Sequence, residues 1–378
     1  MNSRTQWFRI ASVILALAVV AVSCGDDSSD TSASTTVADT TAGSQEQVLA
    51  DRCQANRDAG TITYLSSFDF AAAASILDVI VADAEGYFDD YCLDVEIQPS
   101  FAPGNGALVA SGGAQLSSAG SFGELVNTNV QGGADLVAIA QYGKTAIEEL
   151  VVPADSDIVE LADLQGATVG IKGDLPYSLQ AMLGIAGVER SSLSEPLLDG
   201  FDPVAHLALG IDALPVYKSN EPAQLDAAGV EYRVFDPLDF DVPASFAVFF
   251  TSSEFLNSHP TAVEDFLRAA FKGFAFAVDN PEMAVGFAFE RIDAAGNPFF
   301  FSTEGEGFRW ITESDLVLAT TPAGQGPGLL DTERLGAEIE LLTEVGVFDE
   351  VPDWQSMIAV GLAEGVYDGT EVVEWENL

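Results

Sequence analysis

Short apolar runs and helically spaced apolar positions alternate along most of the chain. In residues 71–84, Ile76, Leu77 and Ile80 recur at the spacing of one helix face. Strands that alternate with helices in this way predict an α/β architecture with mainly parallel sheets. In the first half, the predicted strands are 62–65, 93–97, 115–119, 136–140 and 150–152, and the predicted helices are 71–84, 108–113 and 122–130.

A second set of alternating elements follows, and the chain then becomes mainly helical. The roughly 318 residues from Thr61 onward are too many for one ordinary core and suit two lobes. The second set comprises predicted strands at 168–171, 211–216 and 231–235 and predicted helices at 161–164, 177–185 and 222–228. One apolar strand at 246–250 precedes predicted helices at 262–278, 281–292, 331–344 and 354–363.

The first residues have the pattern of an export signal. Arg4 and Arg9 precede an apolar stretch, residues 10–22, that is too short to span a bilayer comfortably. The Ala-Val-Ser sequence before Cys24 resembles a bacterial lipobox, with alanine at a place where leucine is commoner. The resemblance implies a signal peptide over residues 1–23 and a lipidated Cys24 as the mature N-terminus. An ordinary signal peptide and an uncleaved anchor are the alternatives.

Residues 24–60 form the next segment. Its first part, to about residue 50, consists mostly of Ser, Thr, Asp, Ala and Gly. Such a composition cannot bury enough apolar surface to offset the entropy of ordering, so we expect an acidic, Ser/Thr-rich disordered tether. With a lipidated Cys24, the tether predicts a protein held at the outer face of the cell membrane (periplasmic or cell surface) by its lipid alone.

The remaining cysteines point to a disulfide. With Cys24 acylated, Cys53 and Cys92 are left as a pair in an oxidising compartment, which favours a bond between them. Two unpaired buried thiols are the alternative. His206 and His259 are the only histidines, and no Cys/His spacing resembles a zinc motif, so we expect no metal site and no cofactor.

The chain has a formal net charge of -45 and contains only four lysines. Nucleic-acid contacts need clustered Lys and Arg, so this charge speaks against a nucleic-acid partner. It argues equally against adsorption to an anionic membrane surface. The acidity favours solubility and says little about function.

Four phrases resemble the NMT1/THI5-like group of substrate-binding proteins of ABC importers. Their order and spacing match that group over most of residues 61–360. The phrases are DVIVADAEGYFDDYCLDVEIQPS (residues 78–100), LADLQGATVGIKG (161–173), the strand and two helices of residues 235–284, and FRWITESDL (308–316).

The resemblance implies a type II periplasmic-binding fold, in which two α/β lobes joined by two crossover strands enclose a ligand cleft. We expect residues 61–152 and 246–378 to form lobe 1, including a helical C-terminal part, and residues 153–245 to form lobe 2. The hinge is expected near residues 151–154 and 241–245. The resemblance further implies a small-molecule ligand and the permease of an ABC transporter as partners, and we expect a monomer.

Polar and aromatic residues at the predicted strand ends are the candidate ligand contacts. In open α/β sheets a ligand lies beyond the carboxyl ends of the strands, where loops and helix N-termini converge. The segment 217–222, Tyr-Lys-Ser-Asn-Glu-Pro, can both begin a helix and face such a cleft. The candidates are Ser66, Phe68, Ser118, Ser121, Tyr142, Lys172, Tyr177, Tyr217, Asn220 and Glu221.

The resemblance favours a thiamine-precursor pyrimidine, such as hydroxymethylpyrimidine, as the ligand. Phe68, Tyr177 or Tyr217 can stack on its ring, and Asn220 with Glu221 can pair with its donor edge. Burying Glu221 without a partner would cost several kcal/mol, so we expect a donor group of the ligand to bind its carboxylate.

Two other ligand classes are alternatives. Lys144, Lys172 and Lys218 all fall at predicted strand ends, which suits an anion such as an alkyl sulfonate or nitrate, unless these lysines pair with nearby carboxylates. The aromatic run at residues 299–301 can wall an apolar ligand such as riboflavin, although core packing is the favoured explanation because phenylalanine is commonly buried.

An enzyme is the hypothesis of another class, because one branch of the resembled group makes the thiamine pyrimidine. That branch carries a cysteine-rich motif, CCCFC, which this chain lacks. No G-x-S-x-G, H-E-x-x-H or phosphate loop occurs either. We therefore expect a binding protein without catalytic residues.

Overall fold

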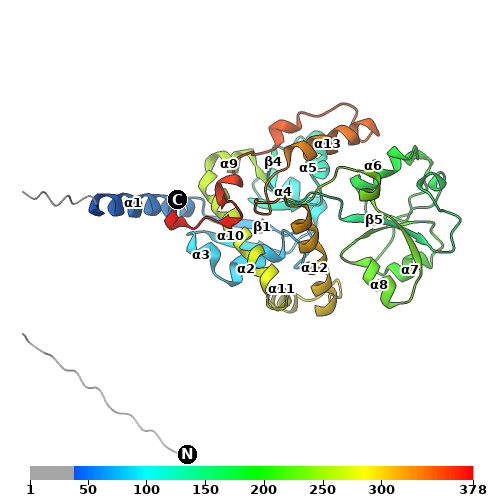
Figure 1. Cartoon of the computed structure of the whole chain (residues 1–378), viewed down its shortest axis with the longest axis horizontal. Helices are drawn as coiled ribbons and strands as arrows, with labels where there is room; N and C mark the ends of the chain where they lie inside the picture. Colours follow the sequence, from blue (N-terminus) through cyan, green and yellow to red (C-terminus); the bar gives the residue numbers. More distant parts are fainter. Residues whose placement is uncertain (1–37, 378) are drawn as a thin grey trace, which may run out of the picture. The chain divides into compact units, whose positions relative to one another are not determined.

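The computed structural model describes residues 38–377, and its two larger β-sheets mark two lobes. In Figure 1, β1 and β4 lie with α2, α4, α5 and α10 in lobe 1, whereas β5 lies with α6, α7 and α8 in lobe 2. The expected α/β class is confirmed. The predicted signal peptide and Cys24 lie outside the described residues.

Lobe 1 is built on a five-stranded sheet in which β1 runs parallel to β2 and β3, while β8 runs antiparallel to β3 and β4. The strand β4 is at the sheet edge but is buried throughout. Later segments cover it, because Ala359 N donates to Ala138 O and Gln141 N donates to Gly328 O, each over 2.9 Å. In spatial order the strands are β2 (Asp94–Gln98), β1 (Thr61–Leu65), β3 (Leu116–Ala119), β8 (Phe246–Ser252) and β4 (Leu136–Gly143).

The helix α10 (Pro260–Asp279) supplies Phe266, Phe271 and Phe274 to the aromatic core on this sheet. Its Phe266 stacks on Tyr64 of β1, and its Phe274 stacks on Tyr142 of β4, with ring centroids 5.5 and 4.7 Å apart. The same helix crosses α2 (Leu77–Ala84) closely at Gly273, where a β-carbon would lie 2.0 Å from the Asp78 carbonyl oxygen. Glycine is therefore required at this crossing.

Lobe 2 has a three-stranded sheet in the order β6 (Leu214–Tyr217), β5 (Glu148–Pro153) and β7 (Tyr232–Phe235). Both outer strands run antiparallel to β5, so the prediction of mainly parallel sheets is wrong here. The chain enters the lobe on β5, and the two later strands pair with it in the opposite direction. The predicted strand at 168–171 is reduced to single parallel bridges, such as Val169 with Ala213.

The two crossovers differ from expectation at one boundary. β5 pairs with the lobe 2 strands, so the chain changes sheet at residues 144–147, ahead of the expected boundary at 152 and hinge at 151–154. It returns through residues 236–245, between β7 and β8, and the expected hinge at 241–245 lies within this return. The side chains of β5 are mostly apolar and would suit either sheet, so the sequence pattern did not locate the boundary between the lobes.

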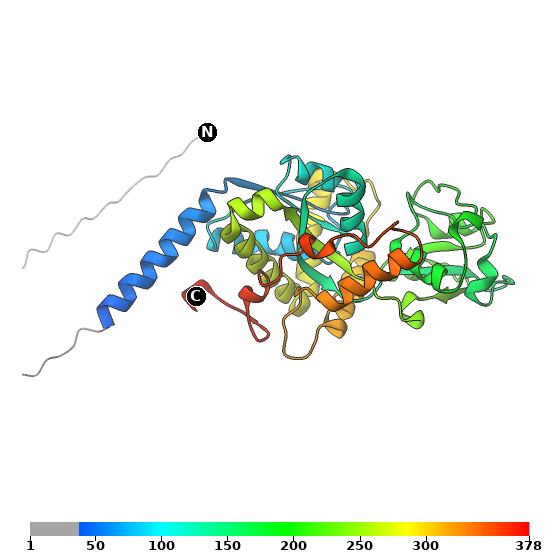
Figure 2. The same ribbon diagram turned by 90° about the horizontal axis from the view of Figure 1, so that it is seen from above.

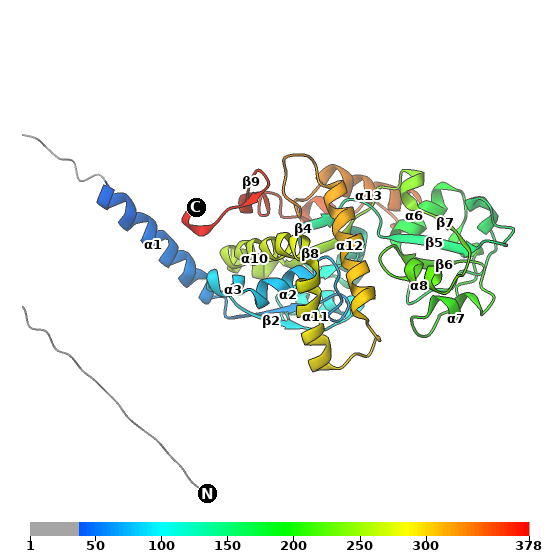
Figure 3. The ribbon, with the colours of Figure 1, turned by 60° about the horizontal axis from the view of Figure 1, so that its bottom comes forward.

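Beyond β8 the chain is helical, as predicted, and part of it touches both lobes. The helix α12 packs beside α11, and α13 contacts α5 of lobe 1 and α6 of lobe 2 (Figures 2 and 3). The predicted helix at 354–363 is wrong: only a 3₁₀ turn, Trp354–Met357, forms before the chain turns to cover β4. No pattern predicted the small hairpin of β9 (Tyr367–Asp368) and β10 (Glu371–Val372).

The other helices fall close to their predicted places, with two shifts. The predicted helix 71–84 begins only at Leu77, because residues 70–76 form an irregular loop, and the predicted helix 108–113 starts earlier, at Ala102. The remaining helices are α3 (Tyr87–Asp90), α4 (Ala102–Ala110), α5 (Phe122–Gly132), α6 (Tyr177–Ile185), α7 (Pro203–Leu207), α8 (Glu221–Ala227), α9 (Ser253–Ser258), α11 (Pro281–Ala295), α12 (Thr303–Thr320) and α13 (Thr332–Glu344).

The expected disordered tether is helical in its described part. The helix α1 (Ala38–Arg57) covers residues expected to be disordered up to about 50, and its last turns are fastened to α10. Arg52 pairs with Asp265 and Glu264, and Asn56 donates to Asp265 over 2.7 Å. Polar contacts of this kind leave no apolar periodicity in the sequence. None of the helices within residues 38–377 combines the length and the apolar character needed to cross a bilayer.

The expected disulfide is present between Cys53 and Cys92, and it joins α1 to the start of β2. The bond closes a loop between residues 39 positions apart in sequence. A crosslink of this span is worth about 4 kcal/mol in the chain-entropy account. We predict that replacing both cysteines by serine lowers the free energy of unfolding in urea by about 2–4 kcal/mol. Equal stability of the variant and the oxidised parent protein would contradict this.

Candidate functional site

A cavity of about 490 Å³ lies between the two lobes and is lined from both. Lobe 1 contributes the loop before α2, the start of α5 and residues of α12, whereas lobe 2 contributes the ends of two strands and the loop at 198–201. Both crossovers reach it as well, through Ile147 and through Phe246 and Ala247. The volume is typical of a site for a small organic molecule.

Phenylalanine rings from both lobes line part of the cavity. Phe68, Phe101 and Phe201 form a cluster there, and Phe299 and Phe301 pack against this cluster from outside the lining. Phe68 lies within 4.9 to 5.8 Å of Phe101, Phe299 and Phe301, measured between ring centroids. Phe201 of lobe 2 closes the cluster, at 5.3 Å from Phe299 and 6.1 Å from Phe68. The cluster offers flat apolar faces at the point where the lobes meet.

An ion pair within lobe 2 lies beside this cluster. The Lys172 ammonium donates to Glu221 Oε1, and the backbone N–H of Tyr217 donates to Glu221 Oε2 over 2.9 Å. Both carboxylate oxygens of Glu221 are therefore engaged. Lys172 also lies 5.9 Å from the centroid of the Phe201 ring. The buried Glu221 has its charge partner within the protein.

The helix α12 joins the lobes through two further carboxylates. Glu313 accepts from Ala74 N of lobe 1 and from Ser219 Oγ of lobe 2, each over 2.8 Å. Arg309 pairs with Glu306 on its own helix and donates to Asn220 Oδ1 of lobe 2 over 3.2 Å. These bonds hold the lobes together across the cavity, and burial raises the pKa of Glu313.

The N-terminus of α5 also faces the cavity, and the protein fills its hydrogen-bonding capacity itself. Ser245 Oγ accepts from Phe122 N, and Glu338 Oε1 accepts from Gly123 N, each over 2.8 Å. Ser121 Oγ accepts from Glu124 N, and Glu124 Oε2 accepts from Gly120 N. The backbone N–H groups of Gly120, Phe122, Gly123 and Glu124 are therefore all occupied by acceptors of the protein itself.

Five of the ten predicted contact residues line the cavity and five lie elsewhere. Phe68, Lys172, Tyr217, Asn220 and Glu221 line it. The other five serve the scaffold. Ser66 accepts from Ser100 N, Ser118 bonds Ser75, Ser121 caps α5, Tyr142 donates to Asp78, and Tyr177 packs on α5 at Gly123.

The three lysines at predicted strand ends do not converge on the cavity. Lys172 and Lys218 pair with Glu221 and Asp236, which is the alternative that the sequence left open. Lys144 is buried in the first crossover without a hydrogen-bond partner among the described residues, and burial lowers its pKa to about 8. Among them, only Lys172 lines the cavity.

Sequence reasoning missed the cavity residues that lie outside strand ends. Phe101, Phe201, Glu124, Arg309 and Glu313 line the cavity but come from loops or from inside helices. Arg309 and Glu313 lie four residues apart and so share one face of α12, a signal that could have marked that face.

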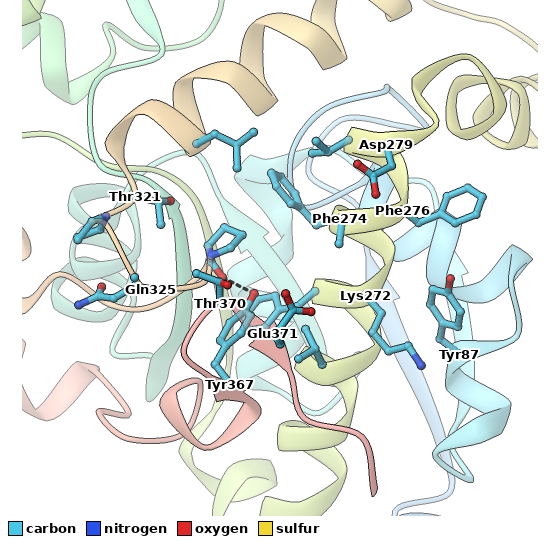
Figure 4. Close-up of a pocket in the computed structure, with 18 of the residues that line it drawn as sticks. Tyr87, Lys272, Phe274, Phe276, Asp279, Thr321, Gln325, Tyr367, Thr370 and Glu371 are labelled. Atoms are coloured by element: carbon cyan, nitrogen blue, oxygen red, sulfur yellow. Dashed lines mark hydrogen bonds between the residues drawn. The ribbon is translucent and has the colours of Figure 1, made fainter. Parts of the chain in front are cut away.

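A larger hollow of about 680 Å³ lies entirely on lobe 1 (Figure 4). It is lined by the last turns of α10, by the loop after α12 and by the β9–β10 hairpin, where the Tyr367 hydroxyl donates to Pro327 O over 2.8 Å. Its one lysine, Lys272, pairs with Glu374 and lies over the ring of Tyr87. No movement of the lobes can enclose a solute there, so we place the functional site in the interlobe cavity.

Within residues 38–377, no group of three or more His, Cys, Asp or Glu side chains is arranged to hold a metal ion. Both cysteines of this part of the chain are joined in the disulfide, so neither is a free thiol.

Burial raises the pKa of three carboxyl groups at and behind the cavity. Glu338 on α13, Glu148 on β5 and Glu124 on α5 are each affected mainly by burial, and Glu148 adds to the shift of Glu338. The pKa of Glu338 rises to about 7 and that of Glu148 to about 6. Glu338 also accepts from Ser245 in the second crossover over 2.7 Å, so it ties the hinge to α5.

We predict that Glu338→Gln flattens the pH dependence of stability. A carboxyl whose folded-state pKa is raised from 4.5 to about 7 contributes stability that is complete below pH 4.5 and is lost as the pH rises through 7. The variant should therefore gain roughly 1–3 kcal/mol relative to the parent between pH 5 and pH 8. Urea unfolding at both pH values measures this, and parallel pH profiles would rule it out.

Comparison with known proteins supports a binding function. The chain is 29% identical over 241 residues to the formylaminopyrimidine-binding protein of Halalkalibacterium halodurans, covering 62% of this chain and 72% of that one. It is 31% identical over 145 residues to the riboflavin-binding protein RibY of Chloroflexus aurantiacus, covering 36% and 40% of the two chains.

The fold is shared with solved structures at low sequence identity. The periplasmic aliphatic sulphonate binding protein SsuA of Escherichia coli matches with a TM-score of 0.59 at 14% identity, over 83% of this chain and 94% of that chain. The desulfurization enzyme DSZB matches with a TM-score of 0.53 at 15% identity, over 81% and 98% of the two chains. The periplasmic-binding fold is therefore confirmed, and it hosts an enzyme as well as binding proteins.

The profile of the NMT1/THI5-like family matches residues 73–284, which include all of lobe 2, both crossovers and the start of the helical region. This match covers more than half of the chain, and it shows that the chain belongs to the NMT1/THI5-like family.

Proposed function

We propose that this solute-binding protein carries a flat heteroaromatic nutrient with N–H donor groups, of the thiamine-precursor pyrimidine class, to an ABC importer. The interlobe cavity is the observation on which the proposal rests. It combines phenylalanine faces from both lobes with carboxylates that can accept from a ring amino group. The relative from Halalkalibacterium halodurans is named for a ligand of this class.

The charges in the cavity argue against the anionic alternative. Lys172 and Arg309 are its only cations among the described residues, and each already pairs with a glutamate. The helix end that would favour an anion is occupied by carboxylates of the protein. An alkyl sulfonate or nitrate would therefore have to displace an existing ion pair, which a neutral donor-rich ring need not do.

Riboflavin is the second candidate, favoured by the aromatic faces of the cavity. Phe68, Phe101 and Phe201 line it, and Phe299 and Phe301 pack against Phe68 from outside the lining. A cavity of about 490 Å³ is within the usual range for ligands of either size. The match to RibY covers 36% of this chain and 40% of that one. It therefore supports riboflavin over a shorter part of the chain than the formylaminopyrimidine-binding relative supports the pyrimidine.

We also propose that the chain is a binding protein without catalytic activity, because its two curated relatives are both named as binding proteins. Lipidation of Cys24, attachment to the outer face of the membrane and a monomeric state complete the proposal. Mass spectrometry of the mature N-terminus tests the lipid, which would be absent if an ordinary signal peptide were cleaved.

Isothermal titration of the body with three solutes tests the ligand class. We expect heat of binding and a dissociation constant in the micromolar range or tighter for hydroxymethylpyrimidine or formylaminopyrimidine, and none for ethanesulfonate. Binding of riboflavin alone would select the second candidate. Binding of ethanesulfonate alone would overturn the proposal.

We predict that Glu221→Gln weakens pyrimidine binding. The change leaves the Lys172 ammonium without its charge partner at the cavity wall, where it repels the N–H donors of the ring. A loss comparable with one charge-assisted hydrogen bond, about 1.5–3 kcal/mol, should lower the affinity about tenfold or more. Titration calorimetry measures this, with the exposed Glu189→Gln in the same lobe as the control. An unchanged affinity in Glu221→Gln would remove this residue from the site.

A further inference from the structure

We propose that Glu124, at the third position of α5, receives the N–H donor of the solute and thereby makes the cavity selective for donor-bearing rings over anions. This inference rests on the proposed function and adds a specificity-determining residue to it. The sequence did not mark Glu124, because a glutamate at this place in a helix normally serves only the helix end.

The acidic side chains that line the cavity differ in the hydrogen bonds that their oxygens already accept. Glu221 uses both oxygens, for Lys172 and for Tyr217 N. Glu313 also uses both, for Ser219 and for Ala74 N. These two carboxylates can bind a solute only by giving up a bond within the protein.

Glu124 is bonded only to backbone N–H groups at the start of its own helix. Its Oε2 accepts from Gly120 N over 2.9 Å, and the N–H of Ser121 also bonds the carboxylate. No side-chain donor, lysine and arginine included, reaches it among the described residues. It is part of the cavity lining, next to Ala119 and Gly120. A carboxylate that faces a cavity without a cation can accept a further donor from a solute.

The groups around Glu124 add no cation. Tyr177 on α6, Tyr217 on β6 and Glu148 on β5 each have a pKa raised in part by the charge of Glu124. Burial in turn raises the pKa of Glu124 itself. This end of the cavity therefore repels an anion and is stabilised by a bound N–H group, since the solute would supply the missing donor.

The remaining acid of the cavity cannot take this role. Asp199 is exposed at the rim, in the loop that carries Phe201, and its side chain is free to be solvated. Glu124 of lobe 1 lines the same cavity as Phe68 and Phe201, so a ring that contacts these phenylalanines lies in the space that the carboxylate also faces.

A pair of probes tests the inference separately from the proposed function. The probes are hydroxymethylpyrimidine and the analogue in which a methyl group replaces its amino group. We expect the parent protein to prefer the amino compound about tenfold or more in titration calorimetry, and Glu124→Gln to lower that preference to about threefold or less. Glu333→Gln is the matched control, because it removes a first-turn glutamate from α13, away from the cavity. It should keep the full preference.

The outcomes separate the two claims. If the parent protein binds neither pyrimidine, the proposed function fails. If the parent prefers the amino compound and folded Glu124→Gln keeps that preference, only the role of Glu124 is overturned. Should Glu124→Gln fail to fold, as judged by circular dichroism, Glu124→Asp keeps the charge but withdraws it by one methylene and must likewise reduce the preference.

Discussion

The position of the cavity depends on one constraint of topology. The chain leaves the first sheet after β4 and returns to it at β8, and these strands are hydrogen-bonded neighbours. In lobe 2 the corresponding strands, β5 and β7, are neighbours as well. Both crossovers must therefore run side by side, and residues at their ends, Ile147 and Phe246, line the space between the lobes. Two adjacent connections allow the lobes to pivot about a site that stays between them.

Buried carboxylates accept many of the hydrogen bonds that hold the backbone around this site. The loop before α2 is irregular, and its Ala72 and Ala74 N–H groups are satisfied by Glu306 and Glu313 of α12. Glu338 does the same for α5 and for the second crossover. In a chain of net charge -45, part of the acidity is thus internal, where it supports backbone that neither helix nor sheet could satisfy.

The sequence predicted the elements that bury a periodic apolar face and missed those held by polar contacts. Strand β1 and helix α10 are where their apolar spacing puts them, whereas the end of α1 is fixed by Arg52 and a disulfide. In the same way, strand ends led to Lys172, Tyr217 and Glu221, but not to Phe201, whose place depends on the packing of two lobes. Contacts between distant segments produce no local periodicity in the amino-acid sequence, so a sequence pattern cannot predict them.

The central claim is that the two lobes close around a solute held between them. Pulsed electron paramagnetic resonance between nitroxides at positions 189 and 282, both exposed and on different lobes, measures this most directly. The account predicts a broad distance distribution without solute and a single narrow, short distance with saturating hydroxymethylpyrimidine. A distribution that stays unchanged while calorimetry shows full binding would contradict it.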